Sequence, residues 1–214
     1  MNWISRIIGG RGDSEALDPG VAEILAHWQS LPDADLGRAH FETRYVVLNT
    51  EATGLDLDSD RLLAVGALAI DAGLISPGDS YYATLEDAPS LALSRLLAFA
   101  RKDPVVVFNS AFNLGMLEPV LDQRLGVSLD VQPIDLYFLL PALFPERRGS
   151  PARLADWMDS FAIETFQRHH ALGDGWAIAQ LFLAAQSRAL AQGAGSPRAL
   201  QELERAYRQY RRKA

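Results

Sequence analysis

The order of the apolar segments constrains the fold of this chain more than any other feature. Three β-rich apolar runs follow one another closely, at residues 45–48, 62–70 and 80–85. The residues Asp71-Ala72-Gly73 indicate a hairpin turn after the second run. From residue 90 onward, helical patterns alternate with short apolar runs at 104–108 and 134–136. This order predicts an α/β fold in which a sheet of mixed direction is flanked by helices.

Three parts are predicted along the chain: an N-terminal helical arm (1–43), a central α/β domain (44–190) and a basic C-terminal helix (191–214). Asp18-Pro19-Gly20 begins a helix in the arm, and Ser196-Pro197 begins the C-terminal helix. The arm suits packing against a second subunit, as in a homodimer, or more commonly against its own domain, through Ile4, Ile7, Ile8 and Trp28. Further helices are predicted at 90–101, 112–125, 154–161 and 176–190.

Composition excludes several classes of protein. The chain has 214 residues of which 49% are hydrophobic, enough for one domain with a buried core. It contains no cysteine, which excludes disulfides, thiolate zinc sites and a cysteine nucleophile. The densest apolar stretch, 62–70, is too short to span a bilayer, and the first residues are too short an apolar run for a secretory signal. We therefore expect a cytoplasmic protein without a membrane partner.

Charge is distributed unevenly. The net charge of −7 argues against a generally basic protein that coats nucleic acid. The segment 198–214, however, carries six basic and two acidic residues, a net charge of +4. A basic helix of this kind can hold phosphates, although a solvated helix end is the more common role.

Three polar stretches stand at the ends of predicted elements: 47–55, 107–113 and 169–174. Positions two apart on a strand project to the same face, so Asn49 and Glu51 are expected to lie side by side. Each stretch taken singly has a simpler interpretation. Polar residues at strand ends are usually turn formers, a loop histidine is usually exposed, and an aspartate at a helix start is usually a cap.

Taken together, the three stretches resemble the DEDDh (DnaQ-like) family of 3′–5′ exonucleases, whose fold is ribonuclease-H-like. The first family motif, Asp-x-Glu-Thr-Thr-Gly-Leu, stands here as Asn49-Thr50-Glu51-Ala52-Thr53-Gly54-Leu55. The second ends in Phe-Asp before a helix and stands here as Phe112-Asn113. The third, His-x-Ala-x-x-Asp, is matched in full by His169-His170-Ala171-Leu172-Gly173-Asp174. The resemblance covers about residues 44–190.

The resemblance implies a nuclease mechanism and assigns roles to residues. Phosphodiester hydrolysis in this family uses two divalent cations, Mg²⁺ or Mn²⁺, held by four carboxylates, and a histidine that takes a proton from the attacking water. By resemblance, Glu51 and Asp174 are metal ligands and His169 is the catalytic base. The substrate is the 3′ end of a nucleic acid, expected to be single-stranded, with contacts expected from Thr53, Gly54, Leu55, Asn109 and Phe112.

Two of the four metal-binding positions depart from the family pattern. Asn49 and Asn113 stand where the family has aspartate, so the ligand charge falls from about −4 to about −2. One charge pair roughly 4 Å apart is worth about 4 kcal/mol at an effective dielectric constant of about 20, so weak or absent binding of two Mg²⁺ ions is expected. Ala52 replaces a family threonine, and the connection between residues 85 and 90 is short.

These departures predict a degenerate active site on the exonuclease fold. One hypothesis is a weakly active or inactive 3′–5′ exonuclease; the alternative is a non-catalytic module that binds a nucleic-acid end or a partner protein. An unrelated α/β domain with chance motifs is a third interpretation. If decay is confined to the ligands, changing Asn49 and Asn113 together to aspartate is expected to restore metal-dependent cleavage.

Overall fold

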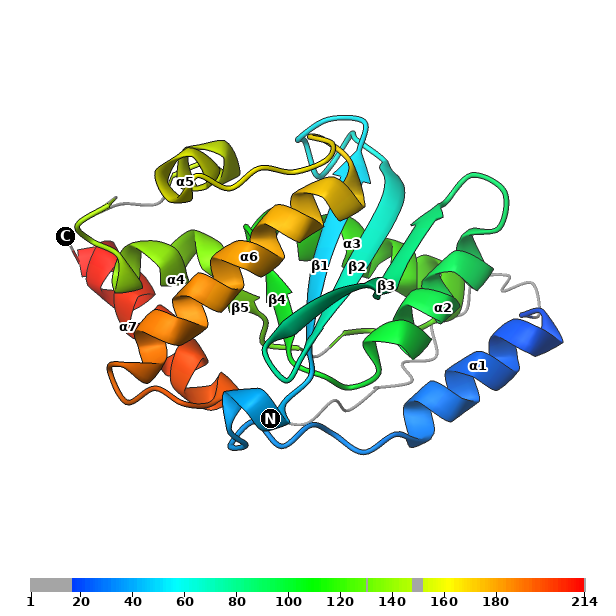
Figure 1. Ribbon diagram of the computed structural model, residues 1–214. Helices are drawn as coiled ribbons and strands as arrows, with labels where there is room; N and C mark the ends of the chain where they lie inside the picture. Colours follow the sequence, from blue (N-terminus) through cyan, green and yellow to red (C-terminus); the bar gives the residue numbers. More distant parts are fainter. Residues whose placement is uncertain (1–16, 130, 148–151, 214) are drawn as a thin grey trace.

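A five-stranded mixed sheet forms the centre of the protein. The computed structural model describes residues 17–129, 131–147 and 152–213 (Figure 1). The strand order is β3-β2-β1-β4-β5; β1 pairs antiparallel with β2, and β2 with β3, whereas β1 with β4 and β4 with β5 pair parallel. The strands span Tyr45–Ala52 (β1), Leu62–Asp71 (β2), Leu74–Thr84 (β3), Val105–Val107 (β4) and Ile134–Asp135 (β5). The predicted fold class is confirmed.

Helices cover both faces of this sheet (Figure 1). Within β1, Tyr45 and Val47 belong to the core on the α6 side, whereas Val46 and Leu48 belong to the core on the other side. A strand buried on both faces reads as a continuous apolar run, which is why the sequence shows one here. The helices span Pro19–Ser30 (α1), Pro89–Ala100 (α2), Ser110–Leu125 (α3), Leu136–Leu143 (α4), Leu154–Phe161 (α5), Ala171–Leu190 (α6) and Pro197–Lys213 (α7), with a 3₁₀ turn at His40–Glu42.

The arm helix α1 packs on its own chain. Asp18 caps it by accepting a hydrogen bond from the Gly20 amide, as the sequence predicts. Trp28 is 1% exposed, and its indole nitrogen donates to the Arg101 carbonyl oxygen at 2.8 Å. Helix α1 therefore packs against its own domain, which is one of the two arrangements expected for the arm. Ile4, Ile7 and Ile8 lie outside the described residues. No helix in the described ranges is both long and apolar enough to cross a bilayer.

Two element boundaries differ from the sequence prediction by five residues or more. The third strand begins at Leu74 rather than at residue 80, directly after a hairpin in which Ala72 and Gly73 both have positive φ. This is the backbone that suits the twist of a two-residue hairpin. Helix α6 begins at Ala171, five residues before the predicted start, because its first turn is held by packing on the sheet. Asp174 therefore lies in the first turn of a helix rather than in a loop.

The first turn of α6 fits tightly against the chain around it. A Cβ atom at Gly66 of β2 would lie 2.7 Å from Cβ of Ala171, and one at Gly173 would lie 1.8 Å from the carbonyl oxygen of Gln167. The loop before α6 is fastened to the same turn, because the Thr165 hydroxyl donates to the Gly173 carbonyl oxygen at 2.5 Å. Glycine at these positions sets how closely α6 approaches its neighbours.

Replacing either of two glycines in α6 by alanine is expected to change the free energy of unfolding, but in opposite directions. Gly173→Ala is expected to lower the free energy of unfolding by about 1–3 kcal/mol, because the methyl group displaces the Gln167 backbone. Gly175→Ala is the matched control: apart from its own stretch of helix, no described atom lies within 4 Å of its Cβ position, so alanine is expected to stabilise by roughly 0.5–1 kcal/mol. Urea denaturation measures both. Equal effects of the two changes would contradict the packing described.

Candidate functional site

A cavity of about 710 Å³ opens at the carboxyl end of β1, between the start of α3 and the start of α6. We call it the groove. All but one of the site residues expected from the sequence line it, the exception being Thr53. The structure thus brings together Asn49, Glu51, Gly54, Leu55, Asn109, Phe112, Asn113, His169 and Asp174. Their chemical roles stay predictions.

Asn49 and Glu51 both reach the first residue of α6. The Ala171 amide donates to Glu51 Oε1 at 2.5 Å, and Asn49 Nδ2 donates to the Ala171 carbonyl oxygen at 3.4 Å. The expectation that the two side chains share a face of β1 is confirmed. The Glu51 carboxylate satisfies one of the free amides of the helix start, where negative charge is also favoured by the helix dipole.

Asn113 is buried, with 3% of its surface exposed, and its amide group is fully hydrogen-bonded. Oδ1 accepts from both the backbone amide and the hydroxyl of Thr50, each at 2.9 Å. Nδ2 donates to the carbonyl oxygens of Phe108 at 2.8 Å and Asn109 at 3.2 Å. An amide can form four such bonds, so the side chain has no free acceptor for a cation. It joins β1 to the start of α3.

The Asp174 carboxylate is paired with the guanidinium of Arg168 in the loop that precedes α6. Burial raises the pKa of Asp174, and the positive charge of Arg168 and the interaction with His169 oppose that rise. Arg168 is a functional candidate that sequence reasoning missed. It is a single basic residue in a loop, and nothing in the sequence pattern indicates its partner.

His169 lines the groove and is exposed, in a left-handed backbone conformation with φ of 57°. A non-glycine residue adopts this conformation only where the surrounding chain holds it. The following residue, His170, turns away from the groove to stack on Tyr82. The strained backbone thus directs two successive histidines to different surroundings.

The oxygen donors of the groove do not fit a pair of divalent cations. Across the part of the chain that the structure describes, no three histidine, aspartate or glutamate side chains form a group that could hold a metal ion. Asn113 has no free acceptor, Asp174 is paired with a guanidinium, and Glu51 is bonded to a backbone amide. Two metal ions need several uncommitted, charged oxygens at short distance.

The turn after β1 forms an apolar rim. Leu55 is 84% exposed, and it lines the groove together with Leu57 and Leu63. Thr53 does not reach the groove because its hydroxyl donates to Asp60 Oδ1 at 2.6 Å inside this turn. Exposed leucines gathered around a cavity form the kind of surface that suits an apolar or aromatic ligand.

A buried ionic network supports the groove from behind. Asp135 is 1% exposed and accepts hydrogen bonds from the amides of Asn109 at 2.9 Å and Ser110 at 2.8 Å, at the start of α3. Arg208 of α7 pairs with Asp135 at 3.0 Å and with Glu204 at 2.6 Å. Burial raises the pKa of Glu204 to about 7, against the lowering effects of the Asp135 amide and Arg208. Arg208 is therefore held by two ion pairs within the fold, and phosphate binding by the basic helix stays a prediction.

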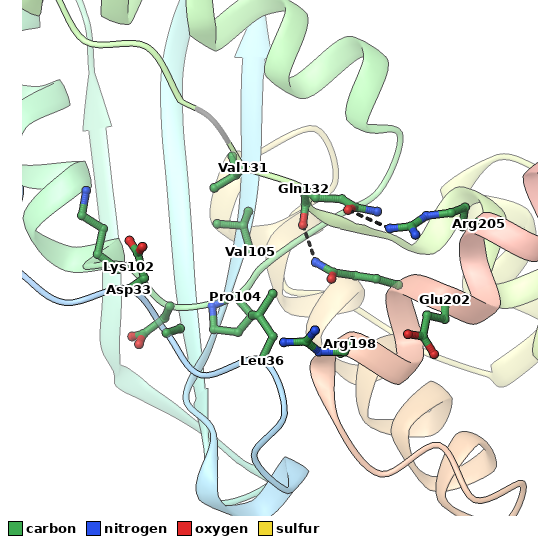
Figure 2. A pocket seen from close by; sticks show the side chains of 13 residues that line it. Asp33, Leu36, Lys102, Pro104, Val105, Val131, Gln132, Arg198, Glu202 and Arg205 are labelled. Atoms are coloured by element: carbon green, nitrogen blue, oxygen red, sulfur yellow. Dashed lines mark hydrogen bonds between the residues drawn. The ribbon is translucent and has the colours of Figure 1, made fainter. Parts of the chain in front are cut away.

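A second cavity, of about 360 Å³, lies at the opposite end of the sheet, between the segment before β4 and helix α7 (Figure 2). Basic and acidic side chains line it in equal number, and Figure 2 shows Lys102 pointing away from Arg198 and Arg205. Arg205 donates to the Gln132 side chain at 3.0 Å. None of the site residues expected from the sequence lines this cavity.

Comparison with known proteins supports the resemblance seen in the sequence. No protein-family model matches the chain. The DNA polymerase III PolC-type of Thermotoga maritima is 26% identical over 167 residues, which cover 66% of this chain and 12% of that protein. A structure of exonuclease I superposes with a TM-score of 0.52 at 16% identity, covering 75% of this chain and 43% of that one. E. coli exonuclease I in complex with a dT13 oligonucleotide gives a TM-score of 0.52 at 15% identity, covering 70% and 42%.

The chain thus spans less than half the length of the proteins that it matches. The structural likeness shows the fold and confirms that the resemblance extends over most of the chain. At these identities it carries no information on which reaction the groove performs.

Proposed function

We propose that this chain, which has the fold of the DnaQ-like 3′–5′ exonucleases, binds the 3′ end of single-stranded nucleic acid in its groove without efficient hydrolysis. The hydrogen bonding of Asn113 is the observation that carries the proposal, because it occupies a metal-binding position of the family with an amide that has no free acceptor. A chain that keeps the groove but not the ligand set is suited to hold a strand rather than to cleave it.

The charge of the groove supports binding without metal. Four carboxylates repel a phosphate unless cations neutralise them, and here two of the four positions are neutral amides. Arg168 offsets the charge of Asp174, and Glu51 is stabilised by the start of α6. A phosphate therefore meets much less repulsion than it would in a site with the full family ligand set.

The rim supplies contacts for bases. Leu55, Leu57 and Phe112 line the groove with apolar surface next to the polar floor. Single-stranded nucleic acid offers both a charged backbone and exposed base faces, and proteins bind it by combining polar and apolar contacts. The related E. coli exonuclease I, which has been solved with a dT13 oligonucleotide, supports a strand of this kind as the ligand.

The experiment is fluorescence anisotropy with a labelled oligothymidylate in EDTA. We expect binding that is unchanged by EDTA and that weakens as salt rises, because phosphate contacts release counterions. Blocking the 3′ hydroxyl group with a bulky label is expected to weaken binding, whereas the same label at the 5′ end is not. Undetectable binding in EDTA, or rapid Mg²⁺-dependent cleavage, would overturn the proposal.

Arg168 offers a charge test of the same site. Arg168→Leu is expected to weaken oligothymidylate binding about five- to tenfold at low salt, because Asp174 is left without its cation, and Arg168→Lys is expected to keep most of the affinity. Arg188→Leu is the matched control, since Arg188 pairs with Glu146 on the surface away from the groove. Equal losses from Arg168→Leu and Arg188→Leu would contradict a local role.

A second candidate function is weak Mn²⁺-dependent 3′–5′ cleavage. The observation that favours it is the presence of Glu51, His169 and Asp174 along one groove. A nuclease assay with Mn²⁺, repeated on His169→Ala, separates the two functions. Slow cleavage that disappears in the variant supports the second candidate, and absence of cleavage in both supports the first.

A further inference from the structure

We propose that Phe166, with Tyr82 and His170 behind it, forms a base-stacking site beside the groove that holds a nucleobase of the bound strand. The inference rests on the proposed function and adds a second contact point for the same ligand. Tyr82 lies on the edge strand β3, whereas Phe166 and His170 lie in the loop that leads into α6. We call these three residues the aromatic site.

Ring geometry is the first support for the aromatic site. The rings of Tyr82 and His170 stack with centroids 4.6 Å apart and planes at 22°. Phe166 lies at 6.2 Å from His170 with its plane at 58°, and 68% of its surface is exposed. A large aromatic ring that is exposed next to a stacked pair offers a free face to another flat ring.

The position of the aromatic site relative to the groove is the second support. In the sheet, Asn49 is paired with Gly66, and Gly66 with Tyr82, so the three residues form one row across β1, β2 and β3. Neighbouring strands are about 4.8 Å apart, which places Tyr82 roughly 10 Å from the groove residue Asn49. The pKa of the Tyr82 hydroxyl is raised by burial and, to a smaller extent, by the charge of Glu51.

The chemistry of the aromatic site fits a base better than a phosphate. None of the three side chains carries a fixed positive charge, and Nδ1 of His170 is buried without a hydrogen-bond partner among the described residues. Stacking on an aromatic ring accepts every base, because each has a flat π face. A strand with its 3′ end in the groove would reach the aromatic site with a base further along the chain.

The test compares thymidylates of about one and about ten nucleotides by anisotropy in EDTA, because the short one cannot span the groove and the aromatic site together. Phe166→Ala is expected to weaken binding of the longer strand roughly tenfold and to leave the shorter strand unaffected. Phe166→Trp is expected to keep or improve affinity, whereas Phe166→Leu, which is apolar but not aromatic, is expected to behave like alanine. Phe41→Ala is the matched control, because Phe41 is 69% exposed in the 3₁₀ turn before β1, at the other end of that strand from the groove.

An abasic scan of the longer strand locates the stacked base. We expect one position at which loss of the base weakens binding of the unsubstituted protein but adds nothing in Phe166→Ala, since the two changes remove the same contact. If the unsubstituted protein binds neither strand, the proposed function itself fails. If it binds both strands and Phe166→Ala is without effect on either, the proposed function stands and the aromatic site is wrong; a partner protein that uses these rings would give this result.

Discussion

Asn113→Asp is expected to lower the free energy of unfolding by about 2–4 kcal/mol at neutral pH. A carboxylate can still accept from Thr50, but its second oxygen would face the carbonyl oxygens of Phe108 and Asn109 without a hydrogen to donate. Burial raises the pKa of such a carboxyl group above the unfolded value of about 3.9. The loss is therefore smallest below about pH 4 and grows as the pH rises toward neutrality.

The control for this prediction is Asn109→Asp. Asn109 lies one turn away at the start of α3, is exposed, and does not cap the helix with its side chain. The same chemical change there is expected to alter stability by about 0.5 kcal/mol or less. Urea denaturation of both variants between acid and neutral pH provides the measurement. A neutral-pH stability of Asn113→Asp equal to that of the unsubstituted protein would show that the amide donor bonds contribute nothing.

The hydrogen bonds of Asn113 also change what is expected when Asn49 and Asn113 are both replaced by aspartate. From sequence alone, Asn49→Asp with Asn113→Asp rebuilds the family ligand set. In the structure, the new carboxylate at 113 must first exchange its bonds to the two carbonyls for bonds to a cation. Mn²⁺ is therefore expected to raise the melting temperature of the double variant more than that of the unsubstituted protein. The metal-dependent gain in melting temperature tests this without any activity assay.

Asp135→Ala is expected to cost about 3–5 kcal/mol of stability. Its carboxylate accepts from the amides of Asn109, Ser110 and Tyr137, and it pairs with Arg208. Removing it takes the acceptor from these backbone donors and leaves Glu204 as the remaining ion-pair partner of Arg208. Because two of the amides belong to the start of α3, the groove is expected to loosen together with the fold.

Asp79→Ala is the control for Asp135→Ala. Asp79 also pairs with an arginine, Arg44, at 3.2 Å, but its side chain is 42% exposed, so a loss below about 1 kcal/mol is expected. Guanidinium denaturation compares the two variants, and hydrogen exchange of the Asn109 and Ser110 amides reports on the start of α3. Exchange at these amides that stays as slow in Asp135→Ala as in the unsubstituted protein would contradict the supporting role of the network.

The elements whose bounds were predicted well are those whose sequence pattern depends on neighbouring residues. Helix α5 occupies the residues expected, 154–161, and the alternating core residues of β1 explain its continuous apolar pattern. Helix α6 starts earlier than predicted because Gly173 and Gly175 weaken the helical pattern, while Glu51 and the packing on Gly66 hold the first turn. That information lies in residues more than a hundred positions away in the chain.

The residues of the groove likewise divide into those that sequence patterns predicted and those that depend on distant partners. Motif spacing predicted nine residues that meet in one groove, because motifs at strand ends and helix starts meet at one edge of the sheet. Arg168 and Asp135 were not expected, since each is a single charged residue whose importance depends on a distant or irregularly placed partner. The hydrogen bonds between Asn113 and Thr50 could not be predicted from the sequence either, because the sequence shows only that an uncharged amide replaces a family aspartate.

The amide at position 113 sets a stability barrier against its own replacement by aspartate. Asparagine and aspartate differ by a single nucleotide in the genetic code, so the carboxylate lies within reach of any mutating population. Yet the first step toward it weakens the whole molecule before a metal ion can repay the loss. Selection for a stable protein is therefore expected to act against aspartate at this position, whichever ligand the groove holds.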